Sequence, residues 1–436
     1  MQHSHRRQFL QTAAAVATQA RPILGANDRV NLGIIGLGGR GRDHVNSYAQ
    51  LPEARLAALC DVNQEALERA AAMVQKLQGH KAKEFADMRR LLDDKEVDAV
   101  SVATPNHWHA LTTIWACQAG KDVYVEKPAS HNVFEGRQMV AAARKHGRMV
   151  QVGSQSRSLF HKIKAMKLLE AGVIGKIYQA RGLCYRWRKS IGKTPVTEAP
   201  PGIQWDLFLG PAPMRPFTIN RFAYNWHWFW DTGNGDIGNQ GVHEMDICLW
   251  GLRPKSAFPR HVASTGGKFL WDDDQETANT QQAVFDYGDA QIVFEVRNLQ
   301  TLGEGGIPFG GSSLVGNLFL GSEGCMEVHP YGFKVYRGEK REVSHEEKPA
   351  EDVIWDPRPH MKNFLRAVTS RDPRHLTASI EAGSDAAALC HLANISYRLG
   401  RRLALDPAAG RFTGDSEADA MLTRRYRAPY IVPEKI

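Results

Sequence analysis

Apolar runs rich in β-branched residues alternate with amphipathic segments over the first third of the chain. The runs at 30–35, 54–60, 99–103, 122–125 and 149–152 predict mostly buried strands. The segments at 42–50, 64–78, 108–119 and 132–146 predict helices, and the last three end at or beside a glycine. Strands and helices that alternate in this way predict a doubly wound parallel sheet, which we assign to residues 27–152.

The pattern changes after Gly153. Alternating apolar and polar positions at 282–287 and 291–296 flank a Gly-Asp turn, and 319–327 predicts a second strand–turn–strand unit. An amphipathic helix is expected at 380–399. We therefore predict a second, α+β domain over 153–436, with an open and mainly antiparallel sheet flanked by helices. Its Trp- and Pro-rich stretch 186–235 is long for a loop and is expected to line a cleft, and the glycine-rich stretch 303–311 is expected to be a mobile loop that could cover a substrate.

A glycine cluster follows the first predicted strand and opens the first predicted helix. Gly36, Gly38 and Gly41 have the spacing G-x-G-x-x-G, the phosphate-loop fingerprint of a Rossmann dinucleotide-binding unit. The second predicted strand ends at Asp61, 20 residues after Gly41, where a carboxylate is expected to bind the adenosine ribose hydroxyls. Because a carboxylate repels a 2′-phosphate, NAD is favoured over NADP, although Arg40 would soften this preference. A purely structural glycine turn is the less favoured interpretation.

The first 26 residues have the composition of an export leader. Arg6 and Arg7 are followed by Phe9, Leu10 and an alanine-rich run without an acidic residue, a pattern similar to a twin-arginine signal. The run is too short and too polar to span a membrane, so we expect no stable membrane insertion. The pattern predicts a periplasmic or otherwise exported protein, and a cytoplasmic one if the leader is not functional.

Composition narrows the function classes. Of the 436 residues 43% are hydrophobic and 23% charged, as in ordinary globular proteins, and the formal net charge is +8. No basic stripe interleaved with aromatic residues is present, so nucleic-acid binding is not expected. The six cysteines are scattered singly, without a CxxC pair, and His107-Trp108-His109 lacks a third ligand motif. We therefore expect neither a disulfide framework nor a metal site.

Four ordered motifs resemble one family. They are Gly36-Leu37-Gly38-Gly39-Arg40-Gly41, Ala103-Thr104-Pro105-Asn106-His107-Trp108-His109, Glu126-Lys127-Pro128 and Gly241-Val242-His243-Glu244-Met245-Asp246. Together they are similar to the Gfo/Idh/MocA oxidoreductases, the glucose–fructose oxidoreductase and inositol dehydrogenase family. The resemblance implies a Rossmann domain that binds NAD, and a dimeric or tetrameric assembly. It also implies that the dinucleotide lies against the glycine motif, Asp61, Thr104, Asn106, His109, Glu126, Lys127 and Gln155.

The same resemblance assigns the chemistry. A cis bond before Pro128 would aim Lys127 at the nicotinamide pocket, where an ammonium can stabilise negative charge on the reacting oxygen. Asn239, His243 and Asp246 have the spacing i, i+4 and i+7 and would share one face of a helix. His243 can accept the hydroxyl proton near neutral pH. The alternative for this trio is a capping asparagine and a core histidine.

One residue departs from the family pattern. Where its dehydrogenases often have Asp-x-Gly-x-His, this chain has Asn239, and an amide cannot take a proton. Asn239 is therefore expected to contact substrate and catalytic groups without relaying a proton. Trp228, in the tryptophan-rich stretch, is expected to stack on a sugar face.

Three functions are compatible with these residues. The favoured one is an NAD-dependent oxidoreductase that removes hydride from a secondary hydroxyl of a sugar, sugar acid or cyclitol. The second is a redox-neutral enzyme with tightly bound NAD, either a sugar–sugar oxidoreductase or an NAD-assisted glycoside hydrolase; the glycosidase branch usually lacks the lysine of Glu-Lys-Pro. The third is a non-catalytic protein that binds NAD or a sugar, which the presence of Lys127 and His243 disfavours.

Overall fold

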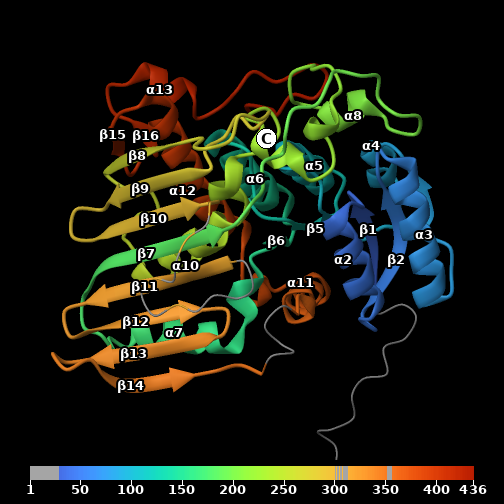
Figure 1. The fold of residues 1–436 in the computed structure, drawn as a ribbon. Helices are drawn as coiled ribbons and strands as arrows, with labels where there is room; N and C mark the ends of the chain where they lie inside the picture. The colour runs from blue at the N-terminus through green and yellow to red at the C-terminus, as the bar shows by residue number, and fades with distance from the viewer. Residues whose placement is uncertain (1–28, 300, 302–303, 305–306, 308–312, 351–355) are drawn as a thin grey trace, which may run out of the picture.

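The computed structural model describes residues 29–436, except 300, 302–303, 305–306, 308–312 and 351–355. The leader predicted at 1–26 and most of the glycine-rich stretch 303–311 lie outside the described residues. The chain forms two α/β units side by side (Figure 1). None of the helices in the described part of the chain combines the length and the hydropathy that a bilayer-spanning segment requires.

The first unit is a six-stranded parallel sheet in the order β3-β2-β1-β4-β5-β6. Its strands are β1 (Val30–Ile35), β2 (Ala54–Cys60), β3 (Lys83–Phe85), β4 (Ala99–Val102), β5 (Asp122–Val125) and β6 (Val150–Val152). Its helices are α2 (Gly39–Ala49), α3 (Gln64–Gln78), α4 (Met88–Leu92), α5 (Asn106–Gln118) and α6 (Val133–His146). Every residue of β4, β5 and β6 is buried, as expected for strands covered on both faces.

Local signals explain where these helices begin and end. The Asn63 and Asn132 side chains accept hydrogen bonds from the first turns of α3 and α6. Gly79 and Gly147 end the same two helices in the left-handed conformation. The sequence pattern therefore specified these elements to within a few residues.

The second unit is built on a ten-stranded sheet in the order β14-β13-β12-β11-β7-β10-β9-β8-β15-β16. Neighbouring strands are antiparallel except for β7 and β10, which are parallel. The strands are β7 (Ile177–Arg186), β8 (His261–Gly267), β9 (Thr280–Asp286), β10 (Gln291–Arg297), β11 (Ser313–Gly321), β12 (Gly324–His329), β13 (Gly332–Arg337), β14 (Glu342–Glu347), β15 (Leu403–Asp406) and β16 (Arg411–Phe412). The predicted fold class, a Rossmann sheet followed by a mainly antiparallel α+β domain, is confirmed.

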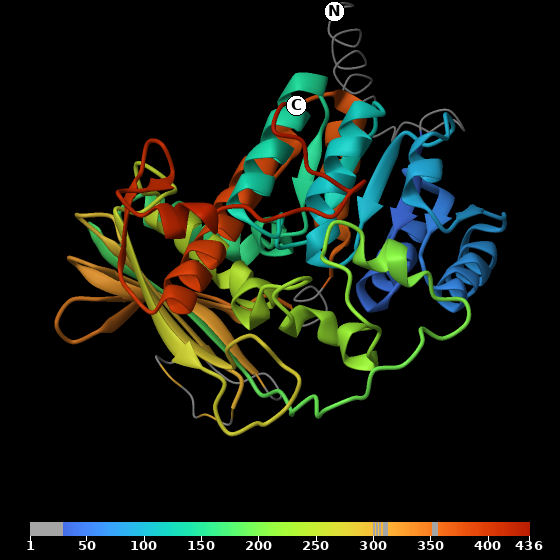
Figure 2. The same cartoon turned by 90° about the horizontal axis from the view of Figure 1, so that it is seen from above.

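Helices cover the face of this sheet that is turned toward the first unit (Figure 2). They include α7 (Phe160–Glu170), α9 (Gly235–Asn239), α10 (Gly241–Leu252), α12 (Ile380–Leu399) and α13 (Ser416–Ala420). Helix α11 (Arg358–Ser370) packs instead on β1 and α2 of the first unit, and the short helices η2 (Gln155–Ser158) and η6 (Pro373–His375) contact α11. Helix α10 packs on β7 and β11, and α12 packs on β8 and also on α6 of the first unit. The chain then returns to the first unit, where Tyr430 and Val432 join its core. The two units therefore share a packed junction.

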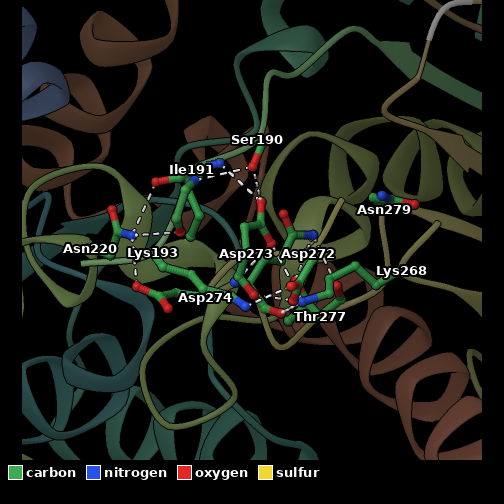
Figure 3. A network of polar contacts seen from close by, with 12 residues as sticks. Ser190, Ile191, Lys193, Asn220, Lys268, Asp272, Asp273, Asp274, Thr277 and Asn279 are labelled. Carbon is green, nitrogen blue, oxygen red and sulfur yellow. Dashed lines mark hydrogen bonds and ion pairs between the residues drawn. The ribbon is translucent and has the colours of Figure 1, made fainter. Parts of the chain in front are cut away.

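The Trp- and Pro-rich segment 186–235 is held in place by a hydrogen-bonded cluster (Figure 3). It contains α8 (Trp205–Leu209), η3 (Ile219–Arg221) and η4 (Asn225–Trp228) in place of a single continuous loop. The buried carboxylate of Asp273 accepts hydrogen bonds from Ser190 Oγ at 2.7 Å and from the Ile191 N–H at 3.0 Å. Asp274 accepts from the Thr194 N–H at 2.9 Å and from Asn220 Nδ2 at 2.9 Å. The loop between β8 and β9 thus anchors the segment at residues 190–194 and again at Asn220.

Replacing Asp273 is expected to loosen this segment. Asp273→Ala leaves the Ile191 N–H and the Ser190 hydroxyl without their buried acceptor, which costs about 2–3 kcal/mol of unfolding free energy. The change would be measured by denaturant unfolding, together with faster proteolysis within 186–235. Asp272→Ala is the matched control, because the Asp272 side chain is 89% exposed and its ion pair is with the exposed Lys193. Equal stability of the two variants would contradict the anchoring role of Asp273.

Candidate active site

The glycine motif forms the tight turn between β1 and α2. Gly36 has φ +85°, and a Cβ at Gly41 would lie 1.8 Å from the Gly36 carbonyl oxygen, so neither position accepts a side chain. By contrast, nothing lies within 4 Å of a Cβ built at Gly38 or Gly39. No side chain caps the N-terminus of α2. The open backbone and the uncapped N–H groups fit a diphosphate at this helix end.

Asp61 lies directly after β2, beside this turn. Its two carboxylate oxygens accept hydrogen bonds from the N–H groups of Leu37 at 2.5 Å and of Asn63 at 2.8 Å. Burial raises the pKa of Asp61, and these two N–H groups oppose that shift. The carboxylate is therefore held rigidly, with lone pairs left for the ribose hydroxyls of a dinucleotide.

Arg40 and Gln155, both assigned to the cofactor, converge with His44 on the carboxylate of Glu126. Glu126, at the end of β5, accepts hydrogen bonds from Arg40 Nε at 2.8 Å and from Gln155 Nε2 at 3.3 Å, and His44 Nε2 lies 3.0 Å from the same oxygen. Burial acts to raise the pKa of Glu126, but Arg40 and His44 outweigh it and hold the pKa well below its usual value. Glu126 is thus an anion that fixes Arg40 and Gln155 beside the glycine turn.

Thr104, Asn106 and His109 lie where β4 leads into α5. Asn106 Nδ2 donates to Asn234 Oδ1 at 3.0 Å, and the His109 ring nitrogens lie 2.8 Å from the Thr104 carbonyl and 2.7 Å from the Pro128 carbonyl. Both side chains are 1% exposed. They therefore brace the loops around the site, whereas the buried Thr104 hydroxyl has no partner among the described residues and is available to a ligand.

Lys127 reaches from the first unit to the second. The Lys127–Pro128 peptide is cis, as the family resemblance implied. The Lys127 ammonium donates to the Asn239 carbonyl oxygen at 2.9 Å and lies 3.5 Å from Asn239 Oδ1. Burial lowers the pKa of Lys127, an effect that Glu126 opposes and Arg40 reinforces. A desolvated ammonium with spare donors is suited to hold a substrate oxygen.

The prediction that Asn239, His243 and Asp246 share one face of a helix is wrong. The chain breaks at Gln240, because α9 ends at Asn239 and α10 begins at Gly241. Asn239 turns its amide to the Tyr224 hydroxyl at 3.0 Å and to Asp236 Oδ1 at 3.1 Å. Asp246 instead pairs with Arg157 at 2.8 Å. The break frees the Asn239 carbonyl, which would otherwise be used within a longer helix, to accept from Lys127.

His243 faces the same cleft as Lys127. The cleft has a volume of about 240 Å³ and is also lined by Arg40, Glu126 and Gln155. The imidazole of His243 makes no hydrogen bond to any described residue. Burial, reinforced by Lys127, lowers the pKa of His243 well below its usual value, so the ring is neutral at physiological pH. A neutral, unpartnered imidazole can accept a proton.

Trp228 does not reach this cleft. Its side chain is 3% exposed and lies under Arg188, whose guanidinium carbon is 4.9 Å from the ring centroid. Arg188 in turn pairs with Asp236 at 2.7 Å. Trp228 lies in η4, which contacts α9, and it is not among the residues that line the cleft.

Two buried ionisable residues of the cleft, Lys162 and Glu244, were not singled out from the sequence as site residues. Lys162, on α7, donates to Ser156 Oγ at 3.1 Å, and Glu244, on α10, accepts from Gln240 Nε2 at 3.4 Å. Burial lowers the pKa of Lys162 and raises that of Glu244. Glu244 stands next to His243 in its motif and could have been noticed, whereas nothing distinguishes Lys162 from its neighbouring lysines. No cluster of three or more His, Cys, Asp or Glu side chains suited to a metal occurs within the described ranges.

Comparison with known sequences agrees with this arrangement. Residues 30–154 match the family model described as "Oxidoreductase family, NAD-binding Rossmann fold", and residues 158–300 and 325–432 match "Oxidoreductase family, C-terminal alpha/beta domain". An uncharacterized oxidoreductase, YrbE of Bacillus subtilis, is 33% identical over 144 residues, which cover 33% of this chain and 40% of YrbE. A glycosyl hydrolase family 109 protein of Saccharopolyspora erythraea is 32% identical over 244 residues, which cover 52% of this chain and 48% of that protein. The chain thus matches less than half the length of these two relatives.

Solved structures share the fold over most of the chain. The WlbA dehydrogenase of Bordetella pertussis, crystallised with NADH and UDP-GlcNAcA, matches 88% of this chain and 99% of its own at a TM-score of 0.64 and 22% identity. An oxidoreductase domain protein of Kribbella flavida matches 87% of this chain and 99% of its own at a TM-score of 0.65 and 20% identity. The glycine turn, Asp61 and the matched models make the first unit an NAD-binding Rossmann domain. The chain therefore belongs to the Gfo/Idh/MocA oxidoreductase family.

Proposed function

We propose that this protein is an NAD-dependent oxidoreductase that acts on a secondary hydroxyl of a carbohydrate, a sugar acid or a cyclitol. The observation that carries the proposal is the meeting of Lys127 and His243 in one cleft beside the glycine turn. Their chain positions are far apart, and the Lys127–Asn239 contact joins the elements that bear them.

The two side chains have complementary tasks. Bound NAD would accept the hydride from the substrate carbon. The Lys127 ammonium would donate a hydrogen bond to the hydroxyl oxygen and stabilise the negative charge that develops on it. The neutral His243 imidazole would take the hydroxyl proton, which leaves the carbonyl product. Asn239 would position Lys127 through its carbonyl and would not itself carry the proton.

The polar lining of the cleft supports a carbohydrate substrate. Lys162, Gln240 and Glu244 of the second unit supply hydrogen-bond donors and acceptors to the lining of the cleft. The comparison with WlbA, whose crystals contain a nucleotide sugar acid, points to the same substrate class. Trp228, buried under Arg188, has no part in this proposal.

Replacing Lys127 tests the proposal. Lys127→Ala is expected to lower kcat by about 10²–10³, the usual effect of losing one donor to a developing oxyanion. NADH formation would be measured with purified protein, added NAD and a panel of sugars, sugar acids and cyclitols. Lys167→Ala, on the exposed face of α7, is the control and should retain full activity. An unchanged rate in Lys127→Ala would contradict the proposal and favour a binding protein without catalysis.

The pH dependence follows from the two shifted pKa values. Catalysis needs neutral His243 and protonated Lys127. Because the pKa of His243 is well below its ordinary value, the rate should not change with pH around 6.5. Because burial lowers the pKa of Lys127, the rate should fall on the alkaline side below pH 10.5. Lys127→Arg should move this alkaline limb upward, because a guanidinium stays charged. A rising limb near pH 6.5, or an alkaline limb that is the same in Lys127→Arg, would contradict these roles.

Cofactor choice is expected to depend on Asp61. Its carboxylate beside the Leu37 N–H would repel the 2′-phosphate of NADP, so NAD should be preferred. Asp61→Ala should reduce the preference for NAD, expressed as the ratio of kcat/KM values, by about tenfold or more. Glu65→Ala, whose carboxylate is 76% exposed on the next helix, is the control. If Asp61→Ala leaves the ratio of kcat/KM values for NAD and NADP unchanged, Asp61 does not determine the cofactor preference.

A redox-neutral reaction with retained NAD is the second candidate. The similarity to glycosyl hydrolase family 109 proteins favours it, although the chain matches under half of their length. A protein that cleaves glycosides, or exchanges redox state between two sugars, without net NADH would establish this second function. Export through the predicted leader, which would separate the protein from the free NAD pool, and assembly into dimers or tetramers remain proposals.

A further inference from the structure

A second cavity, of about 270 Å³, lies on the other side of the junction between the two units. It is enclosed by α12, by the chain after α13 and by the loops before α6 and α9. It shares no lining residue with the active cleft. The proposed reaction makes no use of it.

The lining of this cavity has an excess of positive charge. Arg398, Arg424 and Arg425 contribute three guanidinium groups, whereas Asp231 is the only carboxylate among the lining residues. The Asp231 carboxylate is already paired with Arg215 at 2.7 Å, from outside the cavity. At least two of the three guanidinium charges are therefore uncompensated, and the electrostatic potential in the cavity is positive.

Two of the three arginines have no anionic partner. Arg398 and Arg425 form no hydrogen bond or ion pair with any described residue, and the Arg398 guanidinium lies over the Trp230 ring, 5.0 Å from its centroid. Burial lowers the pKa of Arg398, and the more distant Glu276 and Asp231 do not offset it. Both arginines are exposed, and a guanidinium group matches the geometry of a carboxylate or a phosphate, so the pair is free to bind an oxyanion from solution.

The third arginine is fixed by the protein. Arg424 donates from Nη1 to the Asp231 carbonyl oxygen at 2.8 Å, and its Nε lies 3.6 Å from the buried Glu135 carboxylate. Its Nη2 and the Nδ1 of His131 are nevertheless buried without partners among the described residues. Arg424 therefore forms a rigid positive wall behind the two unpartnered arginines.

We propose that this cavity binds the oxyanion group of a small molecule, a phosphate or a carboxylate, through Arg398 and Arg425. Guanidinium groups bind both kinds of oxyanion through paired N–H donors. The volume admits the anionic group with a small organic part and excludes a dinucleotide. The site is separate from the diphosphate position at the N-terminus of α2.

The test uses the protein saturated with NAD, so that the glycine turn is filled. Inorganic phosphate and citrate would be titrated separately at constant ionic strength, with chloride as the balancing salt, and binding followed by calorimetry. One anion should bind with a Kd of about 1 mM or below, and Arg398→Gln or Arg425→Gln should weaken it about tenfold or more. Arg366→Gln, an exposed arginine of α11 far from the cavity in sequence, should bind as the wild type does.

Each outcome decides the proposal. A preference for phosphate or for citrate identifies the oxyanion. Either result supports the proposed site if Arg398→Gln and Arg425→Gln lose the binding. Absence of binding by the wild type, or equal affinity in the variants, would overturn it and leave the two arginines as solvated surface charges. Because Arg425 is exposed, Arg425→Gln should fold, and its thermal stability without ligand should equal that of the wild type. If Arg398→Gln does not fold, Arg425→Gln alone tests the proposal.

Discussion

The active site depends on one hydrogen bond between a buried ammonium and a main-chain carbonyl. Lys127 belongs to the Rossmann unit, and the carbonyl of Asn239 belongs to the second unit. A buried cation is costly unless acceptors replace its hydration, so the ammonium favours the arrangement in which the two units meet at this point. The Asn239 carbonyl is free to accept this hydrogen bond because α9 ends at Asn239 and α10 begins at Gly241. A break in a helix thus supplies the contact that closes the site.

The buried charges around this contact are balanced in pairs. Glu126 is neutralised by Arg40 and also contacts the His44 ring, Asp236 is neutralised by Arg188, and Asp246 by Arg157. These pairs fix the walls of the cleft, while the Lys127 ammonium keeps spare donors and the His243 ring remains unpartnered. The site therefore presents the Lys127 ammonium and the His243 imidazole to a ligand from a frame whose main charges are paired. Arg40 Nη2 and Glu244 Oε2 also lack partners among the described residues. Such preorganisation is what stabilisation of a developing oxyanion requires.

Much of the fold could be predicted from the sequence because its signals are local. Strand periodicity, asparagine caps and terminal glycines lie within a few residues of the elements that they specify, as at Asn63 and Gly79. The glycine turn and Asp61 were found for the same reason. The helix break at Gln240 was missed because the spacing of Asn239, His243 and Asp246 also fits one continuous helix. The position of Trp228 and the inclusion of Lys162 in the cleft depend on contacts between segments that are distant in sequence. Residue spacing within a short stretch cannot predict such contacts.

The measurement that tests the account most directly is the near-ultraviolet absorbance of the NAD-loaded protein during a single turnover with each carbohydrate of the panel. The account predicts that at least one secondary alcohol produces the NADH absorbance band in the wild type, and that the band forms far more slowly in Lys127→Ala and in His243→Ala. A band that forms equally fast in all three proteins would contradict the assigned roles of Lys127 and His243. Absence of the band with every carbohydrate, in a protein shown to hold NAD, would contradict the proposed oxidation itself.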